Sequence, residues 1–157
     1  MENDEFQKLV SLGPLISIDL ILTNSDHEYL LGRRKSEPAK DHWFVPGGRI
    51  RKNEKIEDAF RRICRDELGE EIEIESANLL GVFEHFYDCS SLSETIGTHY
   101  VVLAYSLNRD LSINSIPNYQ HEEILWFTEK MLSNEKNIHD YAREYCHIIK
   151  RRQNSPG

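Results

Sequence analysis

Apolar and polar positions follow two different patterns along this chain. Several stretches are nearly continuous apolar runs rich in Ile, Leu, Val and aromatic residues, which is typical of strands buried in a sheet. These runs predict strands at 15–22, from residue 29, and at 79–87, 98–107 and 124–128. Asn24-Ser25-Asp26 is a turn signal, and the polar stretch 35–42 predicts a loop.

Other stretches place apolar residues at the spacing of one helical face. The clearest helix is predicted at 54–68, where Gly69 follows in the position of a C-terminal cap and the apolar stripe comprises Ile56, Ala59, Phe60, Ile63, Cys64 and Leu68. A short helix is predicted at 5–12 and another at about 138–152. Strands dominate the middle, and helices lie between and after them. The pattern therefore predicts an α+β fold with helices packed on a mixed sheet.

Length and composition predict one domain over residues 1–157. No internal repeat, linker or shift in composition marks a second one. No apolar run approaches the ~20 residues that a membrane span requires, and the first residues are acidic, unlike a signal peptide. The three cysteines are odd in number and widely spaced, which is typical of reduced thiols. We therefore expect a cytoplasmic protein that does not bind membranes.

The formal net charge of −8 argues against nucleic acid as a partner. An anionic small molecule would have to be bound by a local group of arginines or by a metal ion. We therefore expect such a ligand to bind at one local positive site and not over the whole surface.

One segment carries most of the candidate chemistry: Gly47-Gly48-Arg49-x4-Glu54-x7-Arg62-x3-Asp66-Glu67-x-Gly69. The glycines permit a sharp turn and bring backbone carbonyls close to a ligand. Glu67 lies one helical turn after Ile63, so its carboxylate should emerge beside the core, where an acid needs a partner or a cation. Arg62 could orient Glu67, and Asp58 and Asp66 are its helical neighbours. A hard cation held by few carboxylates, with water and substrate phosphates completing its shell, is the usual arrangement for Mg²⁺. An ordinary surface helix with salt-bridged acids would show similar residues.

The segment resembles the Nudix box, G-x5-E-x7-R-E-U-x-E-E-x-G-U, in which U is aliphatic. The residues that match at the required spacing are Gly48, Glu54, Arg62, Glu67 and Gly69. Asp66 replaces a Glu, Ile63 stands where the box has its first helix Glu, and Glu70 stands where the box has an aliphatic residue. The resemblance implies a Nudix-type mixed β-sheet sandwiched by helices.

Six segments outside and within the box resemble the GDP-mannose mannosyl hydrolase branch of that family, which also lacks the first helix Glu. They are 17–20, 31–34, 43–49, 85–88, 98–102 and 120–121. This resemblance implies a homodimer that uses Mg²⁺, with Mn²⁺ as a substitute, to hydrolyse GDP-mannose, GDP-glucose or both. Water would attack the anomeric carbon with inversion, giving GDP and the free sugar.

The same resemblance implies which residues hold the metal and activate water. The metal would be held by the Gly47 carbonyl, Glu67 and Gln120. His121 would be the general base, and the ordinary histidine pKa of ~6.5 suits that task at neutral pH.

Seven further residues are implied to act on the nucleotide sugar. They are Arg34, Arg49 and Tyr100 at the diphosphate, Asp19 and His85 at the sugar, and Phe6 and Tyr87 at the guanine, where the pair is expected to meet across a dimer interface. Departure of the diphosphate builds negative charge on phosphate, which two arginines and Mg²⁺ stabilise, and positive charge on the sugar. An acid within an apolar strand is rare without a partner, which independently favours a functional role for Asp19.

Two other functions fit the sequence. A Nudix pyrophosphohydrolase would cleave the diphosphate to a nucleoside monophosphate and a sugar 1-phosphate, and Asp66 beside Glu67 could recruit the further metal ion it needs. A non-enzymatic module would only bind the nucleotide sugar. Taken singly, the histidines also suit structural roles, and Phe6 and Tyr87 suit core or interface packing.

Overall fold

The computed structural model describes residues 2–88, 96–117 and 121–155. The elements in chain order are α1 (Asn3–Leu12), β1 (Leu15–Thr23), β2 (Tyr29–Arg34), β3 (Trp43–Phe44), β4 (Gly47–Arg49), α2 (Ile56–Leu68), η1 (Ile74–Ser76), β5 (Asn78–Tyr87), β6 (Thr98–Asn108), η2 (Ile113–Ser115), β7 (His121–Phe127), α3 (Glu129–Asn134) and α4 (Asp140–Gln153). The strands and helices predicted from the apolar patterns are all present, and residues 35–42 form a loop.

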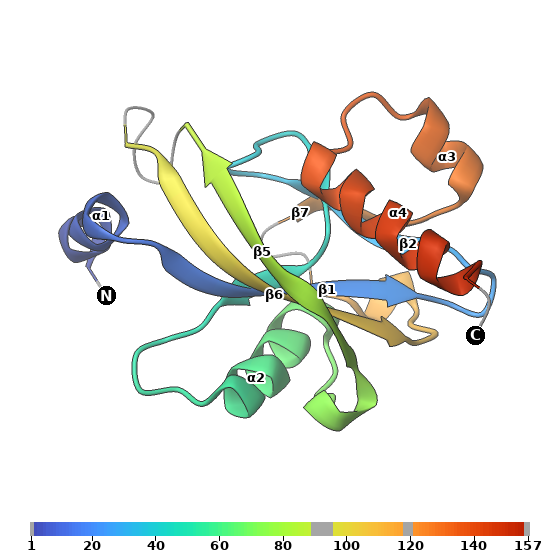
Figure 1. Cartoon of the computed structure of the whole chain (residues 1–157), viewed down its shortest axis with the longest axis horizontal. Coiled ribbons are helices and arrows are strands. Elements are labelled where there is room, and N and C mark those ends of the chain that lie inside the picture. Colours follow the sequence, from blue (N-terminus) through green and yellow to red (C-terminus); the bar gives the residue numbers. More distant parts are fainter. Residues whose placement is uncertain (1, 89–95, 118–120, 156–157) are drawn as a thin grey trace.

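The strands form one mixed sheet, in the order β3-β2-β1-β6-β5. β1 and β6 run parallel, whereas the other paired strands run antiparallel. β4 pairs with the first half of β1, whereas β2 pairs with β1 at its end, so the sheet branches at β1. β7 pairs with β2. Helices lie on both faces (Figure 1). The predicted α+β fold, a mixed sheet sandwiched by helices, is confirmed.

β1 packs against both helical layers because successive side chains of a strand point to opposite faces. Ile18, Leu20 and Leu22 share a core with the apolar face of α2. Ile21 belongs to a second core with α4. Asp19 therefore projects to the α4 side of the sheet, the side on which His85 and Tyr145 lie.

Helix α2 lies close to its predicted range, but its buried face differs from the predicted apolar stripe at both ends of the helix. It starts at Ile56, two residues later than predicted, because the Glu54 carboxylate is bonded outside the helix to the Arg51 amide and to Arg62. Ile56 lies in the first turn and is 46% exposed, whereas Glu67 is 7% exposed and joins the buried face. Gly69 caps the helix in the left-handed region, with φ of 79°.

Five short elements were not predicted: β3, β4, α3, η1 and η2. β3 has two residues, and β4 contains two glycines, so neither shows a strand pattern. α3 has six residues and begins at Thr128, whose hydroxyl accepts a hydrogen bond from the Met131 amide. β7 also starts earlier than predicted, at His121. The prediction missed its first residues because they are polar and show no apolar run.

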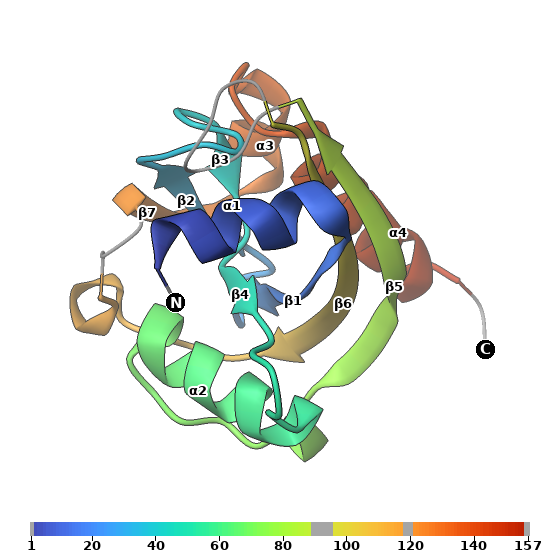
Figure 2. The same ribbon diagram turned by 90° about the vertical axis from the view of Figure 1, so that its left-hand side faces the viewer.

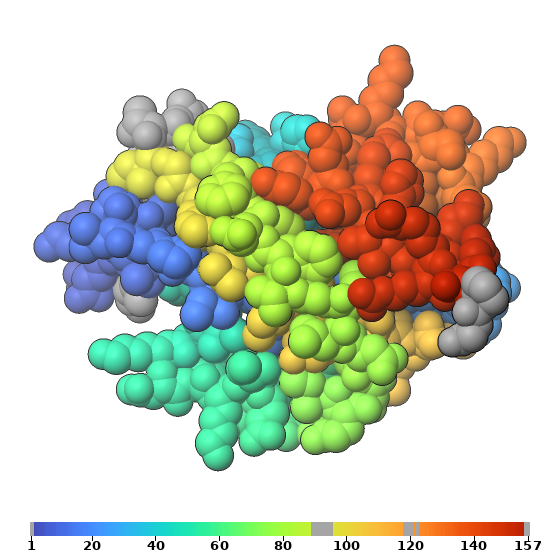
Figure 3. All heavy atoms as spheres, viewed as in Figure 1, coloured from blue at the N-terminus to red at the C-terminus, as the bar shows by residue number. Residues whose placement is uncertain are grey.

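Strand β5 is an edge of the sheet and remains on the molecular surface (Figure 3). Its exposed apolar residues are Leu79, Val82 and Phe86. The Phe86 ring stacks on His99 of the neighbouring strand, with centroids 4.5 Å apart.

Cys64 and Cys146 are buried free thiols, and Cys89 lies outside the described residues. Burial raises the pKa of each of the two thiols to about 12, so both stay protonated at neutral pH. In residues 2–88, 96–117 and 121–155, no helix has the length and apolar character that crossing a bilayer requires.

We predict that Gly69→Ala lowers the free energy of unfolding by about 1–2 kcal/mol, because an L-residue is strained in the left-handed region. A Cβ atom at this position would also lie 2.5 Å from the Ser115 carbonyl oxygen. Urea unfolding measures the change. Gly13→Ala is the matched control, since Gly13 has an extended backbone and a Cβ atom there would meet no other atom within 4 Å. Equal destabilisation by the two changes would contradict the prediction.

Candidate functional site

A cavity of about 400 Å³ opens on the sheet where β1, β2, β4, β5 and β6 come together. Seven of the residues assigned from the sequence line it: Asp19, Arg34, Gly47, Arg49, His85, Tyr87 and Tyr100. Ser17, Phe44, Val45 and Val102 complete much of the wall. Residues far apart in the sequence thus meet in one place.

Strand register explains why these residues meet. Asp19 lies opposite Gly47, and Ser17 lies opposite Arg49, in the β1–β4 pair. In the β5–β6 pair, His85 lies opposite Tyr100. Because side chains alternate between faces, these residues share the cavity side of the sheet.

Gly47 is required by the close approach of β4 to β1. A Cβ atom there would lie 2.5 Å from the Ile18 carbonyl oxygen and 2.6 Å from Asp19 Oδ1. Any larger residue would push β4 away from the Asp19 carboxylate.

Asp19 is a buried acid with one clear partner. The Tyr145 hydroxyl donates to Asp19 Oδ2 at 2.8 Å. Burial raises the pKa of Asp19 to about 7, although the Tyr145 hydrogen bond and the charge of Arg34 both act to lower it. Asp19 can therefore change its charge near neutral pH.

His85 is held by two tyrosines of α4. Its Nε2 atom lies 3.2 Å from the Tyr145 hydroxyl, and its ring stacks on Tyr141 with centroids 3.8 Å apart. Burial lowers the pKa of His85 to about 4, and the neighbouring His139 acts in the same direction. The imidazole is therefore neutral at pH 7.

Two arginines bring positive charge to the cavity. Arg34 Nε donates to the Pro38 carbonyl at 2.8 Å, which fixes the guanidinium against the 35–42 loop. The Arg49 guanidinium lies over the Phe6 ring, 4.7 Å from its centroid. Figure 2 shows α1, which carries Phe6, running across β4.

The aromatic residues assigned to the guanine lie in different places. Tyr87 lines the cavity and contacts Tyr100 edge-on, with centroids 6.1 Å apart. Burial raises the pKa of both phenols, and Arg34 acts in the opposite direction. Phe6 lies against Arg49 and does not line the cavity.

Glu67 and His121 form a second group. A smaller cavity of about 200 Å³ is lined by Gly47, Gly48, Arg49, Asp66 and Glu67, among others. The three residues of β4 line both cavities and are therefore their common wall. The Gly47 amide donates to Glu67 Oε1 at 3.3 Å. His121 Nε2 lies 3.8 Å from the same oxygen.

His121 is enclosed by the fold. It is 2% exposed, and neither ring nitrogen has a hydrogen-bond partner in the part of the chain that the structure describes. Gly32 makes room for the ring, because a Cβ atom at residue 32 would lie 2.5 Å from His121 Nδ1. The structure thus places His121 beside Glu67 and outside the lining of the larger cavity.

These residues suit a divalent cation that takes few protein ligands. Glu67 is a buried carboxylate, and among the described residues its Oε1 has a long contact with the Gly47 amide and His121 nearby. A buried charge with so little compensation is costly, and a hard cation would supply the missing compensation. The described residues contain no group of three or more His, Cys, Asp or Glu side chains able to hold a metal. Backbone carbonyls, water and substrate oxygens would complete the shell, and Gln120 lies outside the described residues.

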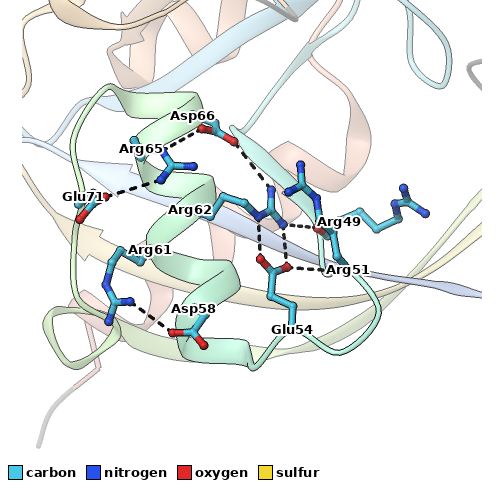
Figure 4. Close-up of polar contacts among 9 residues, drawn as sticks. All are labelled: Arg49, Arg51, Glu54, Asp58, Arg61, Arg62, Arg65, Asp66 and Glu71. Atoms are coloured by element: carbon cyan, nitrogen blue, oxygen red, sulfur yellow. Dashed lines mark hydrogen bonds and ion pairs between the residues drawn. The ribbon is translucent and has the colours of Figure 1, made fainter. Parts of the chain in front are cut away.

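Arg62 does not orient Glu67, contrary to the expectation from spacing. It binds Glu54 through Nε and Nη2 at 2.8 and 2.9 Å, and Nη2 also donates to the Arg49 carbonyl at 2.8 Å (Figure 4). These bonds hold the pKa of Glu54 low, at about 2. Because Arg62 of α2 also donates to the carbonyl of Arg49, the last residue of β4, the Arg62–Glu54 pair fixes α2 against the end of β4.

Two other acids of α2, Asp58 and Asp66, also pair with arginines. Asp58 binds Arg61 at 3.3 Å, and Asp66 lies 3.2 Å from Arg65 and 3.9 Å from Arg62 (Figure 4). Much of this helix therefore is the salt-bridged surface that the sequence also allowed. Glu67 differs from these acids by its burial.

Sequence reasoning missed the contribution of α4. The sequence predicted only the helix at about 138–152 that carries Tyr141 and Tyr145, yet the Tyr141 ring stacks on His85 and the Tyr145 hydroxyl donates to Asp19. A usable signal exists, because a buried tyrosine hydroxyl needs a polar partner and Asp19 is an acid within an apolar strand.

Comparisons with known proteins concern the family and the fold. The family model described as NUDIX domain matches residues 13–147. The low-salt glycan biosynthesis protein Agl8 of Haloferax volcanii is 37% identical over 147 residues, which cover 94% of this chain and 89% of that protein. Among solved structures, the MutT protein from Methanosarcina mazei Go1 is similar with a TM-score of 0.68 and 18% identity, over 92% of this chain and 99% of that one.

A second solved structure contains a ligand. The NUDIX domain of Shewanella oneidensis NrtR, complexed with ADP ribose, is similar with a TM-score of 0.66 and 15% identity. The alignment covers 98% of this chain and 99% of that one. At these identities the two structures establish the fold.

We predict that Asp19→Asn changes how stability depends on pH. The pKa of Asp19 is raised on folding, so the folded chain binds this proton more tightly than the unfolded chain. Its contribution to stability is present below about pH 4 and is lost as pH rises through about 7. Each pKa unit corresponds to about 1.4 kcal/mol. Relative to the Asn variant, wild type should therefore lose up to about 4 kcal/mol between pH 4 and pH 8.

Urea unfolding in metal-free buffer at several pH values measures this difference. Asp26→Asn, at an exposed turn, is the control and should follow wild type throughout. A constant difference between wild type and Asp19→Asn across the pH range would show that Asp19 does not titrate as stated.

Proposed function

This chain belongs to the NUDIX domain family, and we propose that it is a Mg²⁺-dependent hydrolase of GDP-sugars, GDP-mannose or GDP-glucose. Water attacks the anomeric carbon with inversion, and the products are GDP and the free sugar. Mn²⁺ is the expected substitute for Mg²⁺.

The observation that carries this proposal is the combination of charges in one cavity. Arg34 and Arg49 line the same cavity as the buried acid Asp19. A leaving diphosphate gains negative charge while the sugar gains positive charge, so this reaction requires both signs close together. Cleavage between two phosphates develops no positive charge on the sugar, so it would give Asp19 no such task.

The residues near β4 supply the remaining roles. Glu67 and the Gly47 carbonyl would hold the metal together with Gln120, and a bound Mg²⁺ would neutralise diphosphate charge. His121 accepts the proton of the attacking water. Among the described residues neither ring nitrogen has a hydrogen-bond partner, which leaves a nitrogen available to a water, and Glu67 at 3.8 Å could stabilise the imidazolium that forms. Tyr100 assists Arg34 and Arg49, and His85 binds the sugar beside Asp19.

Relatives support a nucleotide sugar as the substrate class. Agl8 is a glycan biosynthesis protein, and nucleotide sugars are the activated sugars on which such synthesis depends. NrtR binds ADP ribose, in which a diphosphate joins a nucleoside to a sugar, on the same fold. Guanine specificity, stacking between Phe6 and Tyr87, and a homodimer remain predictions from the resemblance.

A pyrophosphohydrolase is the second candidate function. Family membership supports it, and Asp66 beside Glu67 lines the smaller cavity, where a second metal would lie. Asp66 is instead engaged by Arg65 and Arg62, which compete with a cation for its oxygens. This pairing favours the anomeric-carbon reaction.

We predict that Glu67→Gln folds normally but loses more than about 100-fold in kcat at limiting Mg²⁺, because a carboxamide lacks the charge that a hard cation requires. Steady-state rates over a Mg²⁺ titration measure the effect. Glu71→Gln is the matched control, since Glu71 is exposed and its ion pair is a surface one with Arg65, at 3.7 Å. Near wild-type turnover of Glu67→Gln at limiting Mg²⁺ would refute the metal assignment.

We predict that hydrolysis in ¹⁸O-labelled water places the label in the free sugar and none in GDP. GDP-mannose, GDP-glucose and ADP-ribose are each incubated with Mg²⁺, and both products are identified by mass spectrometry. Unlabelled mannose kept in the same water corrects for exchange at the anomeric hydroxyl. Inversion is checked by early NMR spectra, in which the anomer opposite to that of the substrate appears first. Label in GMP or in a sugar 1-phosphate would establish the pyrophosphohydrolase instead.

A further inference from the structure

The Tyr145 hydroxyl is shared by two residues of the cavity. It donates to Asp19 Oδ2 at 2.8 Å and lies 3.2 Å from His85 Nε2. Tyr145 belongs to α4, Asp19 to β1 and His85 to β5, and each is at most 7% exposed. Water therefore cannot easily replace either bond.

The number of hydrogens available fixes which group donates and which accepts in each of these two bonds. An ionised carboxylate only accepts, so the single hydroxyl hydrogen of Tyr145 points to Asp19. The hydroxyl oxygen can then only accept from His85. A neutral imidazole carries one hydrogen, which must be on Nε2, and Nδ1 is left with a lone pair.

The imidazole is also held in its plane. Tyr141 stacks on it with an angle of 3° between the rings. The Tyr141 hydroxyl is itself fixed, because it accepts from the Phe86 amide at 3.0 Å and lies 3.2 Å from the Phe86 carbonyl. Burial raises the pKa of Asp19 to about 7 although Tyr145 and Arg34 act to lower it, so the acid is ionised above that pH. Burial and the neighbouring His139 lower the pKa of His85 to about 4, so its ring is neutral there.

We infer that Tyr145 is a positioning residue that fixes the Nε2–H tautomer of His85, so that His85 and Asp19 both present hydrogen-bond acceptors to a polyhydroxylated ligand. A sugar is such a ligand, because each hydroxyl can donate. The part of the inference that concerns turnover rests on the proposed function, whereas the tautomer does not.

The tautomer is measured directly by long-range ¹H–¹⁵N NMR of the histidine side chains at pH 8.5, with His85 assigned through His85→Gln. Wild type should show His85 protonated at Nε2 alone. Tyr145→Phe removes the acceptor of that hydrogen and should produce Nδ1–H or a mixture. A wild-type ring protonated at Nδ1 would overturn the inference without any variant, and so would an unchanged tautomer in folded Tyr145→Phe.

Tyr141→Phe is the matched control. It removes a hydroxyl from the same helix, four residues away, but keeps the ring that stacks on His85. Its His85 should stay in the Nε2–H form. Loss of the tautomer in this variant would assign the effect to general loosening of α4 and would contradict a specific role for Tyr145.

The effect on turnover is read separately from binding of the nucleotide. For a GDP-sugar, Tyr145→Phe should lower kcat about tenfold, the effect of one misplaced hydrogen bond. The Kd of GDP, which lacks the sugar, should stay within about twofold. An equal loss in GDP affinity would make Tyr145 a structural residue only. If no GDP-sugar is hydrolysed by wild type, the proposed function fails, while the NMR result still decides the tautomer.

Discussion

The contact between β4 and β1 at Gly47 and Asp19 is the constraint on which the site depends. Without a side chain at residue 47, the two backbones approach closely enough for the Asp19 carboxylate to lie against β4. The same residue offers its amide to Glu67 on α2. One glycine thus connects the acid of the larger cavity with the carboxylate of the smaller one.

Elements on both faces hold this short strand in place. From α2, Arg62 binds the Arg49 carbonyl and is itself fixed by Glu54. From α1, Phe6 lies under the Arg49 guanidinium. Since β4 has only three residues, these contacts supply the rigidity that its own hydrogen bonds cannot.

Much of the fold was predictable because strands and helices leave different apolar periods. The runs of β1 and β6 and the stripe of α2 are long enough to show theirs. β3 and β4 are too short, and β7 opens with polar residues whose place beside β2 depends on tertiary pairing. The sequence pointed to candidate site residues where a residue type is unusual for its place, as with Asp19, or where a motif fixes spacing, as with Glu67. Spacing paired Arg62 with Asp66, which lies 3.9 Å away, but it missed the closer partner Glu54, because Glu54 lies outside the helix and no helical rule relates the two. Tyr145 was missed because a tyrosine on an apolar stripe shows its ring in the sequence pattern and not its hydroxyl.

The common wall between the two cavities has a consequence for inhibitors. A small molecule that enters from the Asp19 side and displaces β4 would change the spacing between Gly47 and Glu67 without touching Glu67. If Glu67 holds the proposed metal, such a compound would weaken metal affinity while it competes with the proposed substrate in the larger cavity. A metal titration in the presence of the compound would then resemble that of a Glu67 variant, although the compound does not contact Glu67.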